Sequence, residues 1–304
     1  MLEAIILTII TAATPLLLAA TGELVVEKSG VLNLGVEGMM VMGAVAGFAV
    51  TVSTGSPLLG VVGGAIAGVL VSLLFAFVTL TLVANQVASG LALTLFGLGL
   101  SGLMGESFVG QPGIKLASLD IPGLTMLPFV GKVLFGQDIL VYLSFAAVFG
   151  VSWFLNRTRA GLILRAVGDN HSSAHALGYS VIGVRYLAVM FGGAMAGLGG
   201  AYLSVAYTPL WVENMTAGRG WIALALVVFA SWVPWRAAVG AYLFGAVTVL
   251  QLHTQALGIG FPSQFLAMLP YLATVIVLVA ISGNRRATLF NTPSSLGKSF
   301  VPDR

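Results

Sequence analysis

The sequence contains no cysteine and very little charge. Of its 304 residues, 8% are charged and 58% are hydrophobic. Without cysteine the chain can form neither a disulfide nor a thiolate metal site. A soluble domain carries about a quarter charged residues and buries less apolar surface, so lipid is the expected solvent for most of this chain. The net charge of +3 is not the basic footprint that nucleic-acid binding requires.

Long apolar runs recur from one end of the chain to the other. A helix that crosses a bilayer core about 30 Å thick needs about 20 apolar residues. The runs therefore predict an all-α polytopic membrane protein, a single domain over residues 1–304 with eight to ten transmembrane helices and with broken or re-entrant segments. The candidate spans are residues 3–20, 37–53, 57–83, 88–105, 138–156, 184–206, 220–233, 237–256 and 265–282. The first run lacks a signal-peptide cleavage pattern and is interpreted as a span.

The placement of Lys and Arg indicates how the spans are oriented. Basic residues gather in the polar stretch 157–183, at Arg236 and in the tail 283–304. Positively charged loops stay on the cytoplasmic side, so all three are expected there, with a cytoplasmic C-terminus. The long loop 106–137 is then extracytoplasmic. The N-terminus is also extracytoplasmic if nothing within 22–36 is re-entrant.

Glycine is abundant, with 39 residues, and many glycines lie four residues apart. Small residues at this spacing let helices approach closely in lipid, where the hydrophobic effect does not drive them together. Helix packing is therefore the favoured interpretation, and a ligand path is the alternative. The spaced glycines are Gly43 with Gly47, Gly60 with Gly64 and Gly68, and Gly193 with Gly197. The echo of GAVAG at 43–47 in GAMAG at 193–197 is weak evidence for an internal duplication.

The run 57–83 is longer than one perpendicular helix requires. Its length predicts either a tilted helix or a break near the adjacent pair Gly63 and Gly64.

The stretch GVLNLGVEGMM, residues 30–40, places an acid among apolar residues and glycines. A charge at mid-membrane costs at least about 2.5 kcal/mol, so Glu37 needs a partner, an interface or a function. One interpretation places Glu37 in the first turn of the second span, where it favours the positive end of the helix dipole. In the other, Asn33, Leu34 and Gly35 break the helix within the membrane and Glu37 faces a central cavity.

The stretch RAVGDNHSSAHALGYSVIGVRY, residues 165–186, is the longest polar insertion on the predicted cytoplasmic side. The tripeptide at 168–170 predicts a turn with a helix N-cap. Residues 172–177 predict a short helix outside the bilayer, which Gly178 ends. A short exposed helix between two spans suits a protein partner.

Two short patterns resemble ligand sites but are incomplete. His171 and His175 have the spacing of half a metal site, yet no third ligand is near, and a solvated helix face is favoured. The tail stretch TPSSLGKSF ends like a phosphate-binding loop, but Thr292 stands where the pattern requires glycine, and no strand precedes it. The basic tail is expected to rest on anionic lipid headgroups instead.

Polar side chains within or beside the spans are few. They are Asn85, Gln86, Asn214, Gln251, His253 and Gln255. Buried amides need hydrogen-bond partners, which either interhelical contacts or a polar solute can supply; interhelical contacts are favoured. Aromatic side chains can stack on a flat ligand, although Trp is more often an interfacial anchor. The aromatic candidates are Phe48, Phe96, Trp211 and Trp221. No catalytic triad, HExxH motif or pair of intramembrane aspartates is present, so catalysis by this chain is not expected.

GVLNLGVEGMMVMGA at 30–44, together with the later motifs RAVGDN, ALGYSV and GAMAGLGGAYLS, resembles the permease subunits of bacterial ABC importers. The resemblance covers about residues 5–285. It is to the branched-chain amino acid, ribose and nucleoside permease superfamily, and within it to the nucleoside and simple-sugar branch. It implies a fold like that of type II importers and a location in the bacterial inner membrane.

The resemblance also implies roles for particular residues. The polar stretch would hold the coupling segment that docks on a separate ATPase. Its residues are Arg165, Gly168, Asp169, Asn170, Ala174, Ala176, Leu177 and Gly178. Asn33 and Glu37 would shape the translocation path. The further path candidates are Asn85, Gln86, Phe48, Phe96, Gln251 and Gln255. Neither catalytic nor metal-binding residues are implied.

The implied partners are a second, larger permease subunit, an ABC ATPase with two nucleotide domains, an extracytoplasmic substrate-binding protein and membrane lipid. No cofactor is expected in this chain, since ATP and Mg²⁺ would bind the partner ATPase. Nucleosides are the first substrate candidates, followed by purine bases or a simple sugar.

Two other classes of protein remain as alternatives. A secondary transporter driven by protons or sodium usually carries acids at mid-span, and only Glu37 is a candidate here. A channel or a structural membrane subunit is the third possibility.

Overall fold

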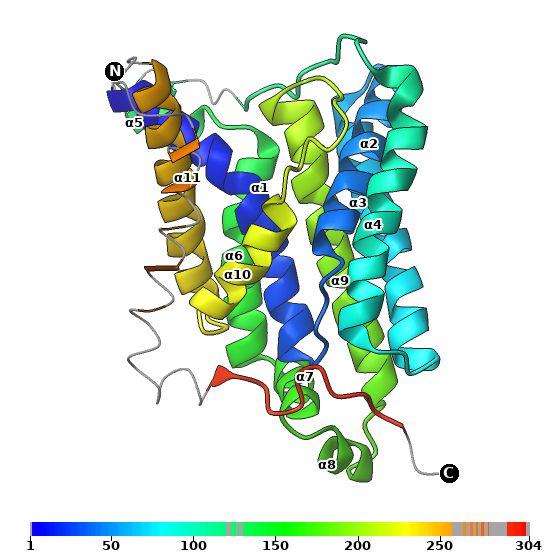
Figure 1. Ribbon diagram of the computed structural model, residues 1–304. Coiled ribbons are helices and arrows are strands. Elements are labelled where there is room, and N and C mark those ends of the chain that lie inside the picture. Colours follow the sequence, from blue (N-terminus) through cyan, green and yellow to red (C-terminus); the bar gives the residue numbers. More distant parts are fainter. Residues whose placement is uncertain are drawn as a thin grey trace.

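The computed structural model describes residues 2–119, 123–125, 127, 130–256 and 291–301, with scattered positions between 264 and 279. Its regular elements are helices (Figure 1). The long ones are α1 (Leu2–Lys28), α2 (Val36–Thr54), α3 (Pro57–Ala76), α4 (Gln86–Gly105), α6 (Ile139–Arg157), α9 (Val181–Ala201) and α11 (Pro234–Ala256). The shorter ones are α5 (Val130–Phe135), α7 (Arg159–Asp169), α8 (His171–Ala176) and α10 (Arg219–Phe229), the π-helical turns η1 (Phe77–Thr81) and η3 (Tyr202–Tyr207), and the 3-10 turn η2 (Glu106–Phe108).

Seven of the described helices are long and apolar enough to cross a membrane. The expected all-α polytopic class is therefore confirmed. The expected count of eight to ten spans is too high for the described residues, because the span expected at 220–233 is the 11-residue helix α10. A helix of this length is about 17 Å long and crosses only half of a bilayer core. The span expected at 265–282 falls mainly outside the described residues.

The chain runs back and forth between two ends of the bundle (Figure 1). The start of α1 and the helix α5 lie at the upper end in this view, and α7, α8 and the tail segment 291–301 lie at the lower end. Ser295 N donates a hydrogen bond to Gly168 O at 2.9 Å, which ties the tail segment to α7. The tail segment and the polar stretch 157–183 therefore share one end of the bundle.

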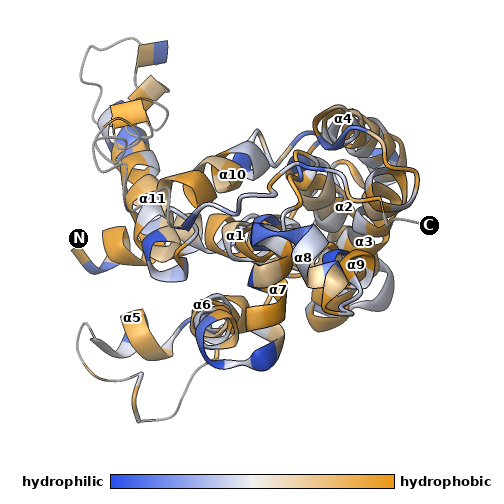
Figure 2. Ribbon diagram, turned by 90° about the horizontal axis from the view of Figure 1, so that it is seen from below, coloured by the Kyte–Doolittle hydropathy of each residue, from blue (hydrophilic) through white to orange (hydrophobic). Residues whose placement is uncertain are grey.

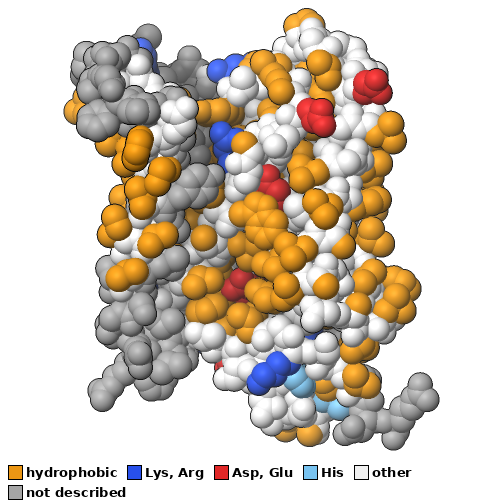
Figure 3. All heavy atoms as spheres, in the orientation of Figure 1, with side chains coloured by type: hydrophobic (Ala, Val, Ile, Leu, Met, Phe, Trp, Pro, Cys, Tyr) orange, Lys and Arg blue, Asp and Glu red, His pale blue; other side chains and the backbone are white. Residues whose placement is uncertain are grey.

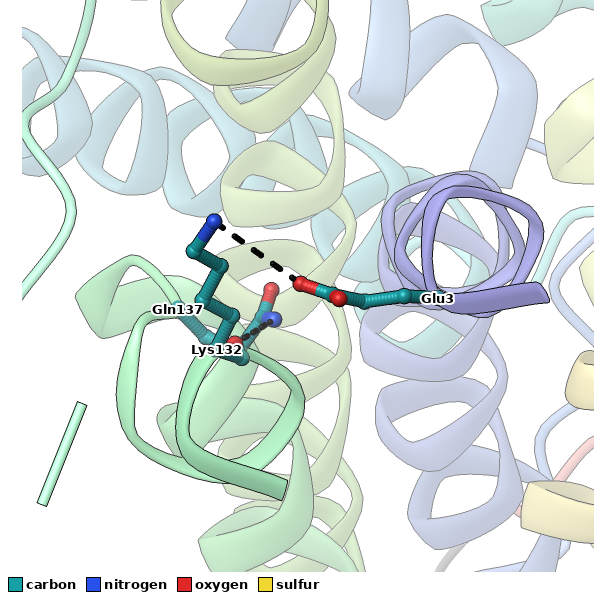
Figure 4. A network of polar contacts seen from close by, with 3 residues as sticks. All are labelled: Glu3, Lys132 and Gln137. Atoms are coloured by element: carbon teal, nitrogen blue, oxygen red, sulfur yellow. Dashed lines mark hydrogen bonds and ion pairs between the residues drawn. The ribbon is translucent and has the colours of Figure 1, made fainter. Parts of the chain in front are cut away.

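Polar contacts at the upper end fix where the chain enters α6. Lys132 Nζ in α5 lies 3.9 Å from Glu3 Oε1 in α1, and Gln137 Nε2 donates to Lys132 O at 3.0 Å (Figure 4). Asp138 caps α6, because its Oδ1 accepts a hydrogen bond from Leu140 N at 2.9 Å. These contacts hold α5 between the starts of α1 and α6.

The helices α2, α3 and α9 pack against one another through glycine. A Cβ added at Gly43 would lie 2.4 Å from Gly197 O, and one added at Gly197 would lie 2.3 Å from Gly64 O. A Cβ at Gly68 would lie 2.1 Å from Gly193 O. These distances are shorter than any van der Waals contact, so the backbones meet only because side chains are absent. Helix packing, the favoured interpretation of these glycines, is confirmed.

The expected break near Gly63 and Gly64 is wrong. Helix α3 continues through both residues and changes to the π-helical turn η1 only at Phe77. A Cβ at Gly63 would lie 2.9 Å from Val50 Cγ2, and one at Gly64 would lie 2.6 Å from Ala201 Cβ. The pair thus serves close packing and not a kink.

Replacing Gly43 with alanine is expected to lower the unfolding temperature of the protein. The new methyl group would push α2 away from the carbonyl of Gly197, and overpacking of this kind costs about 1–3 kcal/mol. Gly99→Ala in α4 is the matched control, since a Cβ there meets nothing within 4 Å and alanine is the better helix former. Thermal unfolding in detergent compares the two variants. Equal unfolding temperatures would contradict the close contact.

Hydrophobic residues predominate along the long helices (Figure 2), and many of their large apolar side chains are exposed. Leu95 in α4 is 71% exposed, and Leu187 in α9 is 68% exposed. Lipid is the solvent that such a surface suits. The polar side chains of functional interest are therefore those inside the bundle and those at its lower end.

Candidate functional site

The second membrane segment is broken, and the break lies inside the bundle. The chain turns at Gly30, whose φ of +88° suits glycine, and it stays non-helical until α2 begins at Val36. Asn33 Nδ2 donates to Glu23 Oε2 at 3.4 Å. Glu23 precedes the end of α1 at Lys28 by about 7 Å, since a helix rises about 1.5 Å per residue. The chain has therefore turned back into the bundle before α2 starts.

Side chains of α4 bind the backbone of this non-helical segment. Leu32 N donates to Gln86 Oε1 at 2.8 Å, and Thr94 Oγ1 donates to Leu34 O at 3.0 Å. Gly90 allows the close approach, because a Cβ there would lie 2.8 Å from Leu34 N. Non-helical backbone at membrane depth persists only where protein or water satisfies it. Here α4 supplies the partners.

Glu37 lies in the first turn of α2, and its carboxylate binds the N-terminus of α10. Oε1 accepts hydrogen bonds from Thr216 Oγ1 at 2.6 Å and from Gly218 N at 2.8 Å, and Oε2 accepts one from Gly220 N at 2.5 Å. Helix α10 has no side-chain cap of its own. Glu37 occupies the first turn of α2, as the first interpretation expects, and it follows the helix break of the second. That Glu37 faces a cavity stays a prediction. The helix it caps, however, is α10.

Two helix N-termini therefore meet at one carboxylate. Figure 1 shows α10 descending from the middle of the bundle and α2 rising beside it. The N-terminus of a helix carries partial positive charge and unpaired N–H groups. A buried carboxylate that accepts hydrogen bonds from N–H groups suits both properties. Glu37, which is 2% exposed, thus joins two half-length segments.

The loop before α10 has strained backbone. Asn214, Ala217 and Gly218 have φ of +56°, +47° and +82°. The left-handed conformation costs about 1–2 kcal/mol for a residue with a Cβ, such as Ala217. The hydrogen bonds that Glu37 accepts from Thr216 and Gly218 lie on either side of Ala217 and hold it in place.

A second buried glutamate holds the other end of α10. Trp232 Nε1 donates to Glu27 Oε2 at 2.5 Å. Trp232 and its neighbour Ser231, in the turn between α10 and α11, both have positive φ, +56° and +49°. The half-helix α10 is therefore attached at its start to α2 and at its end to α1.

Glu23 and Glu27 are buried carboxylates that sequence reasoning missed. Each is 1% exposed, and Oε1 of each has no hydrogen-bond partner among the described residues. The first span was expected to end at residue 20, because these acids lower the hydropathy of the residues that follow. Their i, i+4 spacing was the available signal, since it places both on one face of a continued helix.

A cavity of about 310 Å³ lies beside the start of α10. Its polar lining includes Arg219 of α10 and Thr248 and Gln251 of α11. A neighbouring cavity of about 140 Å³ is also lined by Arg219 and by Tyr207. Arg219 Nη1 donates to Met215 O at 2.9 Å, which orients the guanidinium. The two cavities offer hydrogen-bond donors and acceptors next to a helix end held by Glu37.

The short helix α8 stands at the lower end of the bundle (Figure 1). Asn170 Oδ1 accepts from Ser173 N at 2.9 Å as the N-cap, and Gly178, with φ of +86°, follows the helix end. The expected short helix, its N-cap and its terminal glycine are therefore present. The expected turn is wrong for Gly168 and Asp169, which are the last residues of α7. Helix α7 was not expected from the sequence, because its residues 159–169 are partly basic and include glycine.

Comparisons with known proteins agree with this architecture. Residues 5–281 match the family described as the branched-chain amino acid transport system permease component. The chain belongs to this permease family. TsgC13 of Haloferax volcanii, provisionally named a glucose ABC transporter permease, is 42% identical over 96% of this chain and 95% of its own. NupQ of Bacillus subtilis, named a guanosine ABC transporter permease, is 30% identical over 94% of this chain and 96% of its own. NupC of Lactococcus lactis, named a nucleoside ABC transporter permease, is 35% identical over 59% of this chain and 56% of its own.

The resemblance stated from the motifs is therefore confirmed. The protein is an ABC transporter permease whose relatives are named for sugars and nucleosides. Nucleosides alone are not singled out, because the relative with 42% identity is named for glucose.

The coupling residues implied for the permease fall into two groups. Gly168 and Ala174 are buried and pack inside the segment, whereas Arg165 is half-buried. A Cβ at Gly168 would lie 2.1 Å from Lys28 O. The exposed members are Asp169, Asn170, Ala176, Leu177 and Gly178. Leu177, at 77% exposure, is the apolar tip of α8.

The path candidates of the permease do not converge on one place. Asn33 and Gln86 lie at the broken second segment, and Gln251 lines the larger of the two cavities beside α10. Gln255, one turn after Gln251, is exposed. Glu37 binds the start of α10, and the other three candidates lie elsewhere. Phe48 is buried against Phe108, Phe96 is 49% exposed on α4, and Asn85 caps α4 through Ala88 N at 3.0 Å.

The tail segment 291–301 of the permease covers one side of α8. The ring of Phe300 lies 5.2 Å from that of His171 and 5.3 Å from that of His175, measured between centroids. Figure 3 shows histidine side chains beside basic side chains at the lower end of the molecule. The described residues include no group of three His, Asp or Glu that could hold a metal. The two histidines thus pack against the tail.

Arg185 ties the same tail segment to the broken second segment. It belongs to the polar insertion 165–186 of the sequence and is 1% exposed within α9. Its Nε donates to Ser29 O at 3.2 Å, and its Nη1 donates to Lys298 O at 3.1 Å. Gly297 N adds a hydrogen bond to Gly30 O at 3.1 Å. The tail therefore connects α8 with the residues that lead to Asn33 and Glu37.

Phe300→Ala is expected to loosen the tail from α8. The aromatic contacts with His171 and His175 contribute about 0.5–1.5 kcal/mol beyond buried area, so amide exchange in residues 171–177 should accelerate about two- to tenfold. Phe300→Tyr keeps the ring and should leave the rate unchanged. Hydrogen exchange of the full permease in detergent measures both variants. Equal acceleration in both would show that the ring contacts do not hold the tail.

Acid is expected to loosen the same contact. Burial, and then the charges of Arg185 and Lys298, hold the pKa of His171 below its usual value of 6.5. Because the folded pKa lies below the unfolded one, the neutral ring contributes stability above about pH 6.5 that is lost as the pH falls toward the folded pKa. Exchange in residues 171–177 should therefore accelerate between pH 7.5 and pH 5, after correction for intrinsic exchange rates. His171→Phe should remove this dependence; its persistence would contradict the role of His171.

Proposed function

We propose that this permease forms half of the pore of an ATP-driven importer for uncharged, hydroxyl-rich solutes, namely nucleosides or simple sugars. The observation that carries the proposal is the exposed helix α8, held between α7 and α9 with Leu177 at its tip. An exposed apolar residue on a short, capped helix suits the surface of a partner. A channel or a purely structural subunit has no need of such a helix.

The partner on α8 is a separate ABC ATPase, which holds ATP and Mg²⁺ and supplies all hydrolysis. When its two nucleotide domains close, α8 moves with them. The tail segment and Arg185 link α8 to the residues that follow α1, and those residues lead to Glu37 and α10. A displacement of α8 therefore reaches the two half-length segments through hydrogen-bonded contacts, and alternating access follows from their rearrangement.

The solute passes through the cavities beside α10, where Gln251 and Arg219 provide polar side chains. Hydroxyl groups both donate and accept hydrogen bonds, so amide and guanidinium groups suit a sugar or a ribose ring. The two relatives that match this chain over nearly its whole length are named for glucose and for guanosine. These solutes share neutral charge and several hydroxyl groups.

The complete importer contains further chains. A second permease subunit, larger than this one, forms the other half of the pore, and an extracytoplasmic binding protein delivers the solute. The complex lies in the inner membrane with α7, α8 and the tail segment on the cytoplasmic side. The basic residues of 157–183 favour this orientation.

The test is ATP hydrolysis by the assembled importer. The permease would be co-expressed with its genomic neighbours, purified in nanodiscs, and assayed with the binding protein and with glucose, uridine, guanosine or leucine. Stimulation by glucose or by a nucleoside, but not by leucine, is expected, and the stronger stimulant identifies the solute. Stimulation by leucine alone would overturn the solute class.

A further inference from the structure

Two cationic side chains line a small polar cavity at the lower end of the bundle. It has a volume of about 260 Å³ and lies between the end of α1, the outer face of α7 and the start of the tail segment. Its charged lining residues are Lys28, Arg165 and Asp169. The remaining lining residues are Leu162, Ala166 and Asn291. The cavity is separate from the two cavities beside α10.

The two cations are incompletely neutralised. Lys28 Nζ donates to Asn291 O at 2.6 Å, a neutral carbonyl. Arg165 Nε is buried and has no hydrogen-bond partner among the described residues. Neither cation forms an ion pair with Asp169, since no N···O distance between them is within 4.0 Å. Like charges that share a partly enclosed site repel each other, and a buried N–H without an acceptor is costly.

The charge and shape of the cavity favour a small anion. Two cations and one carboxylate leave one positive charge, which an anion between Lys28 and Arg165 would neutralise. Arginine binds phosphate oxygens through its planar array of donors. Leu162, 59% exposed, lines the same cavity and offers an apolar surface beside the cations. Phosphate joined to an apolar chain is the chemistry of a lipid headgroup.

We propose that this cavity binds a phosphate group, that of an anionic phospholipid, between Lys28 and Arg165. The position of the cavity supports a lipid headgroup as the source of the phosphate. Lys28 ends a membrane-spanning helix and α7 lies just beyond it (Figure 1), which is the depth of headgroups. Basic pockets at this depth are known to bind anionic headgroups. The bound phosphate would fasten α1 to α7, directly before α8.

The test uses the full chain, purified in detergent and titrated with phosphatidylglycerol, diacylglycerol or inorganic phosphate. Bound lipid is counted by native mass spectrometry. Arg165→Gln should weaken phosphatidylglycerol binding at least about tenfold. Arg159→Gln removes an exposed charge from the same helix outside the cavity, and should weaken binding no more than about fivefold, as expected for one surface charge. Arg165→Lys, which keeps the charge but loses the planar array of donors, controls for misfolding and should bind phosphatidylglycerol more tightly than Arg165→Gln does.

The probes separate the sources of the phosphate. Competition by inorganic phosphate that depends on Arg165 supports the phosphate site, and if inorganic phosphate binds as tightly as the lipid, the source is free phosphate. Equal losses in Arg165→Gln and Arg159→Gln would overturn the proposal in favour of general surface attraction. Diacylglycerol binding as tightly as phosphatidylglycerol would overturn it as well.

Discussion

Glu37→Gln is expected to reduce solute uptake by the assembled importer at least tenfold. The carboxylate accepts three hydrogen bonds, from Thr216, Gly218 and Gly220. Glutamine has one acceptor oxygen and one donor amide, so one side of it must face a backbone N–H that also donates. A hydrogen bond to a charged group contributes about 1.5–3 kcal/mol, and losing one corresponds to about 10- to 100-fold. The strained loop before α10 would then lose its anchor.

Glu213→Gln is the matched control, because Glu213 is exposed in the same loop and the change in charge is the same. It should leave both uptake and thermal unfolding nearly unchanged. If Glu37→Gln behaves like Glu213→Gln in both measurements, the carboxylate does not hold α10. A variant that loses uptake without any change in unfolding would still assign Glu37 to transport, but not through anchoring.

Leu177→Ala is expected to weaken binding of the ATPase strongly while leaving the permease folded. Truncating an apolar anchor at the centre of an interface costs about 2 kcal/mol or more, which corresponds to at least about 30-fold in affinity. Because Leu177 is 77% exposed, its side chain contributes little to the fold. Co-purification of the ATPase in detergent, followed by a binding titration, measures the loss.

Leu187→Ala provides the control for this substitution. Leu187 is 68% exposed on α9, within a predicted membrane span and away from α8. It should keep full ATPase binding. Unchanged binding in Leu177→Ala, with the permease folded, would show that the tip of α8 is not the docking contact.

Local patterns predicted much of the fold. Apolar runs located the long helices, because a membrane span needs only length and hydropathy. Their ends were predicted within a few residues except in α1, which continues to Lys28 although its span was expected to end at residue 20. The break at Asn33 to Gly35 and the N-cap and glycine around α8 were also predictable, since Asn and Gly act on their own neighbourhood. Helix α7 was missed, although Thr158 caps it by accepting a hydrogen bond from Gly161 N at 3.0 Å.

Long-range contacts were not predictable from the same patterns. The partners of Glu37 and Glu27 come from the loop before α10 and the turn after it, roughly 180 and 205 residues later in the chain. A single sequence shows that an acid needs a partner but not which segment supplies it. The acceptors of Arg185, the carbonyls of Ser29 and Lys298, were not predictable for the same reason, since both lie far away in the sequence. Phe96 was chosen by residue type, and the structure places it on an outer face.

The buried acids bear on the main alternative, an ion-coupled secondary transporter. Sequence reasoning had only Glu37 as a candidate acid within the spans, and the structure adds the buried Glu23 and Glu27 near the end of α1. Glu37 binds the start of α10, and Glu27 binds the turn after it. These hydrogen bonds explain why the two acids are present in the membrane segments without a coupling ion. Membership in an ABC permease family favours ATP as the energy source.

Uptake of labelled solute into proteoliposomes distinguishes these energy sources. The assembled importer would be reconstituted with the binding protein outside and ATP inside, and this chain alone would be reconstituted in parallel under an inward proton or sodium gradient. Uptake of glucose or a nucleoside by the complex, dependent on hydrolysable ATP and absent with this chain alone, is the predicted result. Gradient-driven uptake by this chain without any ATPase would contradict the assignment and make Glu23, Glu27 and Glu37 the residues that carry the ion.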